Sequence, residues 1–385
     1  MKIAICAIGY NRVDSLSRLL SSLNAAVYDE KVTLIISLDR SKTLDVKTYS
    51  DEFEWKHGEK KVILQECNLG LRRHVLRCGQ YMNDYGFDAL VVLEDDITVS
   101  PYFYSYVKQC VIQYQNDDCI AGISLYSFPI NYITGYPFTP VDSEHDVYLM
   151  NCAMSWGQVW IKEKWNKFID WYNRNDEEFS LPHLPAPINQ WPKSSWLKYH
   201  TRYCIENDLY FVYPYVSLTT NNSDPGTHNK VGHTYMQSRL QCLPRKAWNL
   251  PPSSKIEVRY DGFFEPKFLY DHLHIDEEQL TINIYGTKTN SKNRYELSMN
   301  VLPYKVVKSF GLKYKPIEAN VLCDVKGTDL FLYDKSIACI TTGCNKNNNI
   351  IEYYYLNIYE KFYMWRNFKK LCKDFLKFHA YRILK

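Results

Sequence analysis

The sequence predicts an α/β protein whose core is a doubly wound, mostly parallel β-sheet. Two observations predict this class. Short apolar runs with the length of strands alternate with helical patterns through residues 1–250, which is the order that builds a parallel sheet with helices on both faces. Polar and charged residues also follow directly where several of these runs end. The 385 residues are 46% hydrophobic and 23% charged, as expected of a globular protein with a sizeable core.

Four strands are expected before residue 100, each a short apolar run: 3–8, 32–38, 61–65 and 89–93. The first two helices are expected from Asp14 or Ser15 to Leu23 and over 72–85, where apolar residues recur every three or four positions. The run 89–93 consists of five consecutive apolar residues. Such a run is typical of a strand that is covered on both faces.

The same alternation continues beyond residue 100, where Ser100 and Pro101 mark the start of a helix. Residues 126–150 are expected to form a polar and aromatic loop region. The other expected elements are a helix over 102–114, a strand over 120–125, helices over about 162–173 and 194–207, and a strand over 209–212.

The pattern changes near residue 250, where short β-like runs begin to alternate with polar loops. These runs are 280–285, 330–333 and 336–341. We therefore predict two domains, an α/β domain over 1–250 and an α+β extension of unknown role over 251–385. The extension is expected to end in a basic amphipathic helix over about 352–384.

Composition and cysteine usage exclude several classes of protein. The net charge of +3 is too small to indicate nucleic-acid binding. The twelve cysteines are scattered singly, without the short spacing of zinc sites, which indicates a reduced, cytoplasmic protein. The N-terminus is typical of a first strand and its turn rather than of a signal peptide. No run reaches the roughly 18 uninterrupted apolar residues of a membrane-spanning helix.

The end of the chain is strongly basic. Residues 360–385 contain eight Lys and Arg and two acidic residues, which gives this segment a charge of +6. A helix here would suit the inner face of the cell membrane, with Phe368, Leu371 and Phe375 inserted and the lysines facing lipid phosphates. The alternative is a helix that packs on the rest of the protein and leaves a solvated basic face. We expect the peripheral membrane position.

Three acidic residues, Glu94, Asp95 and Asp96, follow the apolar run 89–93 directly. Carboxylates at the end of a buried strand are costly unless a cation neutralises them. Mn²⁺ or Mg²⁺ bridging them to a diphosphate would do so, and would stabilise the charge on a departing nucleotide. The alternative is a solvated acidic turn before the helix that starts near Ser100.

Other polar residues follow the neighbouring expected strands. Arg12 comes after the first strand, Asp39 after the second, and residues 72–74 open the helix after the third. In open α/β sheets, ligands bind outside the carboxyl ends of the strands. This convergence favours a binding site over a solvated turn at Glu94–Asp96.

Residues 91–103, Val-Val-Leu-Glu-Asp-Asp-Ile-Thr-Val-Ser-Pro-Tyr-Phe, resemble the metal-site segment of N-acetylglucosaminyltransferase I (family 13) and of related bacterial family 2-like transferases, which have the GT-A fold. Residues 5–12 resemble the first strand and nucleotide loop of these enzymes, and residues 36–39 the strand whose aspartate meets the uracil. Residues 156–157 and 164–171 resemble their acceptor-side segment. The likeness covers residues 1 to about 235 and does not extend into the tail.

The resemblance implies a metal and nucleotide site around the acidic residues. Asp96 would hold Mn²⁺, with Mg²⁺ as the alternative, and Glu94 and Asp95 would contact the ribose or metal-bound water. A late histidine often completes the metal or diphosphate site in GT-A enzymes, and His228, in the Gly-flanked segment 226–229, is the candidate. A lone histidine in a loop is otherwise usually just solvated.

The resemblance also assigns binding roles to five further residues. Arg12 and Asp39 would frame the base, and Arg73 or His74 would approach the diphosphate. Trp156 would stack on a sugar face of the acceptor. An arginine on a helix is often only a surface residue, and a tryptophan at the start of a helix is often a core anchor.

Enzymes of this family invert the anomeric centre and use a carboxylate to deprotonate the acceptor hydroxyl. The matching residue is Asp170, with Glu163 and Glu206 as substitutes. The segment 191–196 is a second match to the same family segment, and it is followed by Leu197 and Lys198 with no carboxylate. If that segment is the true equivalent, Asp170 is a residue of the helix surface.

Together these features predict a metal-dependent glycosyltransferase that moves a sugar, with GlcNAc as one candidate, from a UDP-sugar to a glycan or lipid-linked glycan with inversion. The expected setting is synthesis of a bacterial surface polysaccharide or lipopolysaccharide, because the N-terminal anchor of the Golgi enzymes has no counterpart here. One rival is a nucleotidyltransferase acting on sugar phosphates, against which the single glycine in residues 9–12 speaks. The other is a non-catalytic glycan-binding relative, against which the intact acidic triplet speaks.

Overall fold

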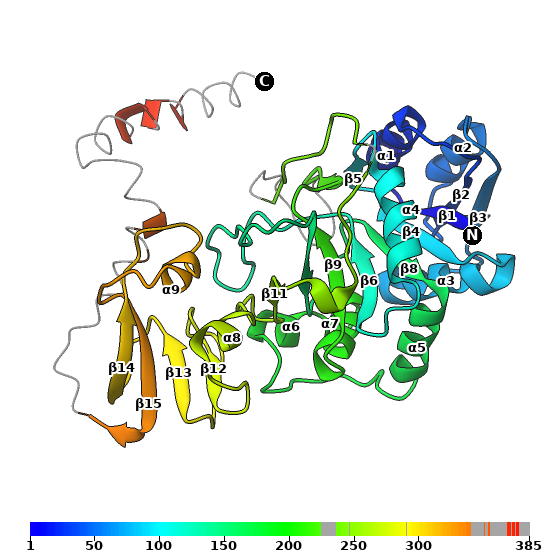
Figure 1. The fold of residues 1–385 in the computed structure, drawn as a ribbon. Helices are drawn as coiled ribbons and strands as arrows, with labels where there is room; N and C mark the ends of the chain where they lie inside the picture. The colour runs from blue at the N-terminus through cyan, green and yellow to red at the C-terminus, as the bar shows by residue number, and fades with distance from the viewer. Residues whose placement is uncertain are drawn as a thin grey trace. The chain divides into compact units, whose positions relative to one another are not determined.

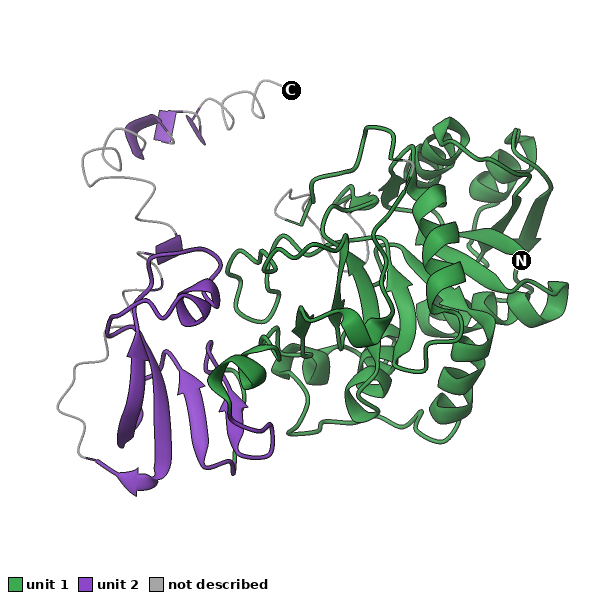
Figure 2. Cartoon of the chain, viewed as in Figure 1, with its two compact units in different colours: residues 1–274, 287–291 green, residues 275–286, 292–385 purple. Residues whose placement is uncertain are grey.

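The computed structural model describes residues 1–224, 236–245, 247–289 and 291–339, and the short stretches 350, 353–354, 368–370, 372–373 and 375–376. These residues divide into two compact units (Figure 2). Unit 1 comprises residues 1–274 and 287–291, and unit 2 comprises residues 275–286 and 292–385. Residues 251–274, which the sequence analysis placed in the extension, therefore belong to unit 1.

Unit 1 is built on a nine-stranded sheet with the strand order β11-β7-β9-β6-β8-β4-β1-β2-β3 (Figure 1). Strands β1 to β4, β6 and β9 run in one direction, and β7, β8 and β11 run in the other. The prediction of a mostly parallel α/β sheet is thus confirmed. The strands are β1 (Ile3–Gly9), β2 (Thr33–Leu38), β3 (Lys60–Leu64), β4 (Ala89–Glu94), β6 (Ile120–Ser124), β7 (Val147–Met150), β8 (Gln158–Ile161), β9 (Tyr210–Pro214) and β11 (Arg259–Tyr260).

Helices cover both faces of this sheet because its central strands are apolar on both sides. Successive residues of β1 point to opposite faces, so that Ile5 and Ala7 enter one core cluster and Ala4 and Cys6 enter the other. The first cluster contains residues of α1 (Val13–Ala25), α2 (Asp45–Glu52) and α4 (Phe103–Tyr114). The second contains residues of α3 (Gly70–Tyr85), α5 (Lys162–Tyr172), α6 (Ala186–Gln190) and α7 (Leu197–Glu206).

A small two-stranded sheet lies beside the main one and carries the end of the acidic turn. It pairs β5 (Ile97–Val99) with β10 (Thr219–Asn221) in antiparallel register. Unit 1 also contains the short helices η1 (Ser253–Lys255) and α8 (Leu269–Leu273). The pairing of β5 with β10 brings a segment from beyond residue 218 next to the carboxyl end of β4.

Unit 2 contains a four-stranded sheet with the order β12-β13-β15-β14. Its elements are β12 (Leu280–Ile282), β13 (Tyr295–Ser298), β14 (Tyr304–Phe310), α9 (Ala319–Leu322) and β15 (Leu330–Ala338). The run expected over 330–333 and the first three residues of the run expected over 336–341 form one strand, β15, because the polar pair Asp334 and Lys335 continues the pairing with β13 and β14. Residues 340–341 of the second run lie outside the described residues.

Two other expectations concern single segments. The region 126–150 is not all loop, since its last four residues form β7. The basic helix expected over 352–384 lies largely outside the described residues, of which 368–370, 372–373 and 375–376 are helical. Within the described part of the chain, no helix has both the length and the hydropathy needed to cross a membrane.

Candidate functional site

The acidic triplet lies at the carboxyl end of β4, the strand next to β1 in the middle of the sheet. Glu94 is the last residue of β4, and Asp95 and Asp96 form the turn into β5. The backbone N–H of Asn222, just after β10, donates to the carbonyl of Asp96 at 2.8 Å. The triplet is therefore held between the central strand and the segment that follows β10.

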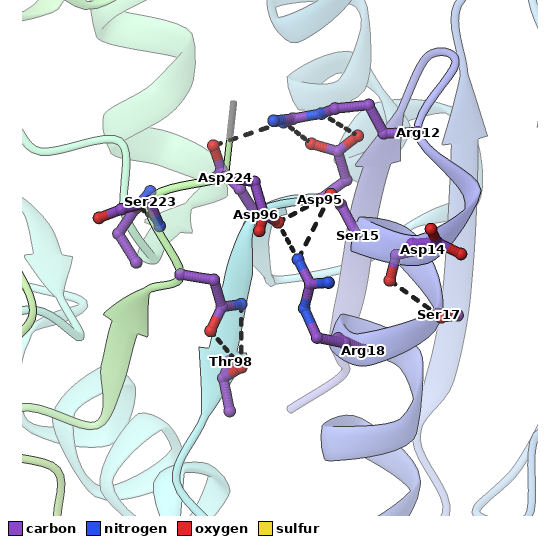
Figure 3. A network of polar contacts seen from close by, with 12 residues as sticks. Arg12, Asp14, Ser15, Ser17, Arg18, Asp95, Asp96, Thr98, Ser223 and Asp224 are labelled. Carbon is purple, nitrogen blue, oxygen red and sulfur yellow. Dashed lines mark hydrogen bonds and ion pairs between the residues drawn. The ribbon is translucent and has the colours of Figure 1, made fainter. Parts of the chain in front are cut away.

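Arg12 contacts two of the three carboxylates (Figure 3). It is the residue before the first turn of α1, at the carboxyl end of the adjacent strand β1. Its Nε donates to Oδ2 of Asp95 at 3.2 Å, and its Nη2 pairs with Oδ1 of Asp95 and lies 3.4 Å from Oδ2 of Asp96. The sequence analysis assigned Arg12 to the base of the nucleotide, whereas in this structure its guanidinium bridges Asp95 and Asp96.

Asp224 adds a fourth carboxylate close to the start of α1. It pairs with Arg18 of α1 and accepts a hydrogen bond from Oγ of Ser15 at 2.8 Å. Figure 3 shows Arg12 beside Asp95 and Asp96, and Arg18 beside Asp224, with both arginines on the side of α1. Asp224 was not among the expected site residues, because contacts across 209 residues leave no local signal.

Burial and the repulsion between neighbouring carboxylates raise the pKa values of Glu94 and Asp95. Burial, with Asp96 beside it, raises the pKa of Glu94 to about 8. Burial raises the pKa of Asp95 to about 6 although Arg12 opposes this shift. Oδ1 of Asp96 is buried and has no hydrogen-bond partner among the described residues. Such a group is costly unless a cation or donor satisfies it, so this oxygen is available to a cation.

The carboxylates are hard oxygen donors of the kind that Mn²⁺ and Mg²⁺ prefer, and the unpaired oxygen of Asp96 fits such an ion. In the described part of the chain, no three His, Cys, Asp or Glu side chains are grouped as metal ligands. Asp95 and Asp96 share the guanidinium of Arg12 instead. His228, the expected further ligand, lies outside the described residues.

Trp196 contacts the triplet from the second core cluster, the one that contains residues of α3, α5, α6 and α7. It precedes the first turn of α7, is buried, and places Nε1 at 3.4 Å from Oε1 of Glu94. Its ring also packs edge-to-face on Trp160 of β8, with ring centroids 5.6 Å apart. The sequence analysis named Trp196 only within the second acceptor-side match, without a contact to Glu94.

Asp39 is buried directly after β2, where its carboxylate holds the start of α3. It accepts hydrogen bonds from the backbone N–H groups of Arg40, Leu69 and Gly70, at 2.9, 2.8 and 2.9 Å. Gly70 has a φ of +72°, a conformation that glycine adopts without strain. Both oxygens of the carboxylate that was expected to frame a base thus accept hydrogen bonds from the backbone in this structure.

The structure separates Arg73 and His74, which were expected to approach a diphosphate. Arg73 is exposed at the start of α3 and donates from Nε to the carbonyl of Leu69 at 3.0 Å. His74 is buried in the core, with Nε2 at 2.8 Å from Oγ of Ser37. Burial alone would lower the pKa of His74, but the neighbouring Cys78 raises it. The contact described for His74 is thus with the core residue Ser37, and its expected role at a diphosphate stays a prediction.

The two acceptor-side residues differ in position. Trp156 is half-buried, its ring packs edge-to-face on Tyr126 at 5.0 Å, and its carbonyl accepts a hydrogen bond from Thr219 of β10 at 2.6 Å. It therefore adjoins the small sheet that carries the acidic turn. Asp170 is exposed on α5, and its backbone carbonyl accepts a hydrogen bond from Nε of Arg174.

The two carboxylates named as substitutes for Asp170 are also on helices away from the acidic turn. Glu163 is exposed in the first turn of α5. Glu206, the last residue of α7, accepts from Nε of Arg202 at 2.8 Å and lies 3.3 Å from Nε2 of His183. No contact described for these side chains reaches the triplet.

Comparisons with known proteins give a partial match. The family described as the SPBC1E8.03c C-terminal domain matches residues 14–176, which is less than half of the chain and includes the acidic triplet. A comparison with curated protein sequences finds no match.

Several solved structures resemble part of the chain. Staphylococcus aureus TarS 1–349 in complex with UDP is 12% identical over 55% of this chain and 57% of that one, with a TM-score of 0.34. The mannosyltransferase PcManGT from Pyrobaculum calidifontis, with GDP-Man and Mn²⁺, is 9% identical over 55% and 54%, with a TM-score of 0.35. A cytidylyltransferase from Leptospira borgpetersenii is 14% identical over 44% and 64%, with a TM-score of 0.28. The chain thus matches less than two thirds of each of these proteins, and similarities this weak do not identify its family.

Proposed function

We propose that this protein is a metal-dependent glycosyltransferase that moves a sugar from a UDP-sugar to a hydroxyl group of a glycan, with inversion. The observation that carries the proposal is the acidic triplet at the carboxyl end of β4, with one buried oxygen of Asp96 unpaired. A turn that exists only to cap a helix would leave its carboxylates solvated rather than buried and coupled. Ligand sites of open α/β sheets lie at this end of the strands.

The proposed division of labour follows the contacts of the triplet. Asp96 would hold Mn²⁺ or Mg²⁺, with Glu94 and Asp95 beside it and His228 as a further candidate ligand. When bound, the metal would supply a positive charge that stabilises the departing nucleoside diphosphate. Trp196 would fix the carboxyl group of Glu94 through Nε1.

Nucleotide recognition would fall to groups around the start of α1 and α3. No side chain caps the N-terminus of α1, so its first backbone N–H groups and the helix dipole favour an anion there. Arg12 and the exposed Arg73 are the cations that we assign to the donor, and Asp39 would position the loop before α3 rather than contact the base through both oxygens. Trp156 is the proposed contact for the acceptor sugar. A glycan of a bacterial surface polysaccharide or lipopolysaccharide is the proposed acceptor, on the sequence resemblance alone.

The test is a donor-hydrolysis screen of the purified chain across nucleotide sugars, with and without Mn²⁺. We expect release of UDP that requires the metal and that Asp96→Asn abolishes. Asp118→Asn is the matched control, because Asp118 is an exposed carboxylate whose ion pair, at 3.0 Å, is with the exposed Lys167. Release of pyrophosphate from UTP and a sugar 1-phosphate, with no release of UDP from any nucleotide sugar, would assign the site to a nucleotidyltransferase, and full activity of Asp96→Asn would reject it as the metal site.

A further inference from the structure

The guanidinium of Arg12 occupies the position between two carboxylates that a divalent cation would neutralise. Nη2 contacts both Asp95 and Asp96, and Nε contacts the second oxygen of Asp95 (Figure 3). An arginine remains charged at every pH at which proteins are folded, and its planar fork suits carboxylate pairs. The free protein therefore already carries a cation of its own at this point.

This cation compensates the triplet only in part. Three carboxylates face one guanidinium, and Oδ1 of Asp96 is buried with no partner in the part of the chain that the structure describes. The side chain of Arg12 is 27% exposed, compared with 8% for Asp95 and 19% for Asp96. Arg12 is thus the most accessible of these three side chains. It lies directly before the first turn of α1, and its side chain makes no capping hydrogen bond there.

We propose that Arg12 is an internal substitute for the divalent cation, which neutralises Asp95 and Asp96 in the free protein and is exchanged to the diphosphate when nucleotide and metal bind together. This inference rests on the proposed function and adds a coupling between its two ligands. A metal alone has to displace a guanidinium and leave it without its acceptors. A diphosphate offers that guanidinium new acceptors, because phosphate oxygens bind arginine as carboxylates do.

The coupling has a sign that can be measured. If the nucleotide favours metal binding through Arg12, the metal favours nucleotide binding by the same factor. Removing Arg12 should therefore strengthen binding of the metal alone while it weakens the dependence on nucleotide. A residue that merely supports the acidic turn would do the opposite, because its loss would disorder the ligands.

Arg18 supplies a matched control on the same helix. It also pairs with a carboxylate, that of Asp224, but no contact described for it reaches Asp95 or Asp96. Its replacement removes a positive charge and an ion pair at the start of α1 without uncovering the triplet. A general effect of net charge on metal affinity would therefore appear in both variants.

The experiment measures bound Mn²⁺ by electron paramagnetic resonance, with and without UDP, in the wild type, Arg12→Gln, Arg12→Lys and Arg18→Gln. We expect weak binding of Mn²⁺ alone to the wild type, and binding at least about tenfold tighter to Arg12→Gln, a factor within the usual range of coupling between ligands. Arg12→Lys should stay close to the wild type, since it keeps the charge and provides a folded variant should Arg12→Gln be unstable. Arg18→Gln should keep the UDP dependence of the wild type.

Three outcomes would overturn the inference. Unchanged or weaker binding of Mn²⁺ alone to Arg12→Gln, while the wild type binds Mn²⁺ with UDP, would show that Arg12 does not compete with the metal and would leave the proposed function intact. An equal gain in Arg18→Gln would reduce the effect to net charge. Absence of Mn²⁺ binding to the wild type even with UDP would reject the metal-dependent function together with this inference.

Discussion

At the scale of single residues, the site is defined by carboxylates that the fold buries and that the cation beside them neutralises only in part. Glu94, Asp95 and Asp96 lie at the end of one strand, and Arg12 is the cation that contacts Asp95 and Asp96. Burial raises the pKa values of Glu94 and Asp95 to about 8 and about 6. Groups with such perturbed pKa values cluster at functional sites, which is the physical basis for assigning function to this turn.

The acceptor base is the first prediction at this scale. Asp170→Asn should abolish sugar transfer to an acceptor while UDP binding with Mn²⁺ is retained, because a base acts only on the attacking hydroxyl. The measurement compares transfer rates and UDP affinity in Asp170→Asn and in Glu163→Gln, which changes another exposed residue of α5. Transfer that survives in Asp170→Asn would show that Asp170 is a residue of the helix surface.

His200 is predicted to make stability depend on pH. It is buried against Phe168, with ring centroids 4.2 Å apart, and burial lowers its pKa from 6.5 to about 3. Between these values the unfolded chain binds a proton that the folded protein does not, so stability falls as pH falls, by up to about 1.4 kcal/mol per pH unit. Urea unfolding at pH 6.5 and 5 should show this loss in the wild type and a smaller one in His200→Gln.

The exposed His183 provides the control for this titration, since His183→Gln should keep the slope of the wild type. An identical slope in His200→Gln and the wild type would mean that His200 is protonated in the folded state or that other groups dominate.

The residues of the site were predictable from the sequence to the extent that they follow strands. Arg12 and the triplet could be placed together because carboxyl ends of parallel strands meet at one edge. Asp224 and Trp196 could not, because they reach this edge from segments 209 and 102 residues away from their partners. The burial of His74 was not predicted, because the helical pattern did not show which face of α3 points to the core.

At the scale of elements, helices α3 and α5 are locked together by a contact that only glycine permits. A Cβ on Gly79 of α3 would lie 2.1–2.3 Å from the ring of Trp165 on α5. This ring has little room to move, because it stacks on Trp160 of β8 with centroids 3.8 Å apart. The close approach therefore fixes α5 on the sheet.

Gly79→Ala is predicted to destabilise the protein despite the higher helix propensity of alanine. Overpacking against Trp165 costs about 1–3 kcal/mol and exceeds the gain of about 1 kcal/mol from removing a helical glycine. The free energy of unfolding should fall by up to about 2 kcal/mol on this balance, whereas Leu71→Ala on the exposed face of the same helix should change it little. A more stable Gly79→Ala variant would contradict the packing described for α3 and α5.

Most elements of unit 1 were predictable because continuous apolar runs and helical spacing mark them locally. The antiparallel strands β7 and β8 and the pair β5 and β10 were missed, because strands of three or four residues depend on distant partners. Helix α2 was missed as well, since it buries only Val46 and Ser50 and has little apolar pattern. These misses matter for function, because β10 carries the segment that leads to Asp224.

At the scale of the whole molecule, the chain combines a complete α/β unit with a second, smaller unit. The proposed chemistry draws only on unit 1, in which every described residue of the site lies. The membrane position expected of the basic C-terminal residues stays a prediction. The cysteines that the structure describes are all free thiols, in keeping with their scattered positions in the sequence.

The most direct test of the central claim is the melting temperature of the purified chain with Mn²⁺, with UDP and with both. A ligand pair at about 100 times its dissociation constant stabilises a protein by about 2.7 kcal/mol, so we predict a rise of roughly 5 °C that requires both ligands. Asp96→Asn should lose the rise and Asp118→Asn should keep it. No rise from any nucleotide with metal, or an equal rise in Asp96→Asn, would contradict a nucleotide and metal site at the acidic triplet.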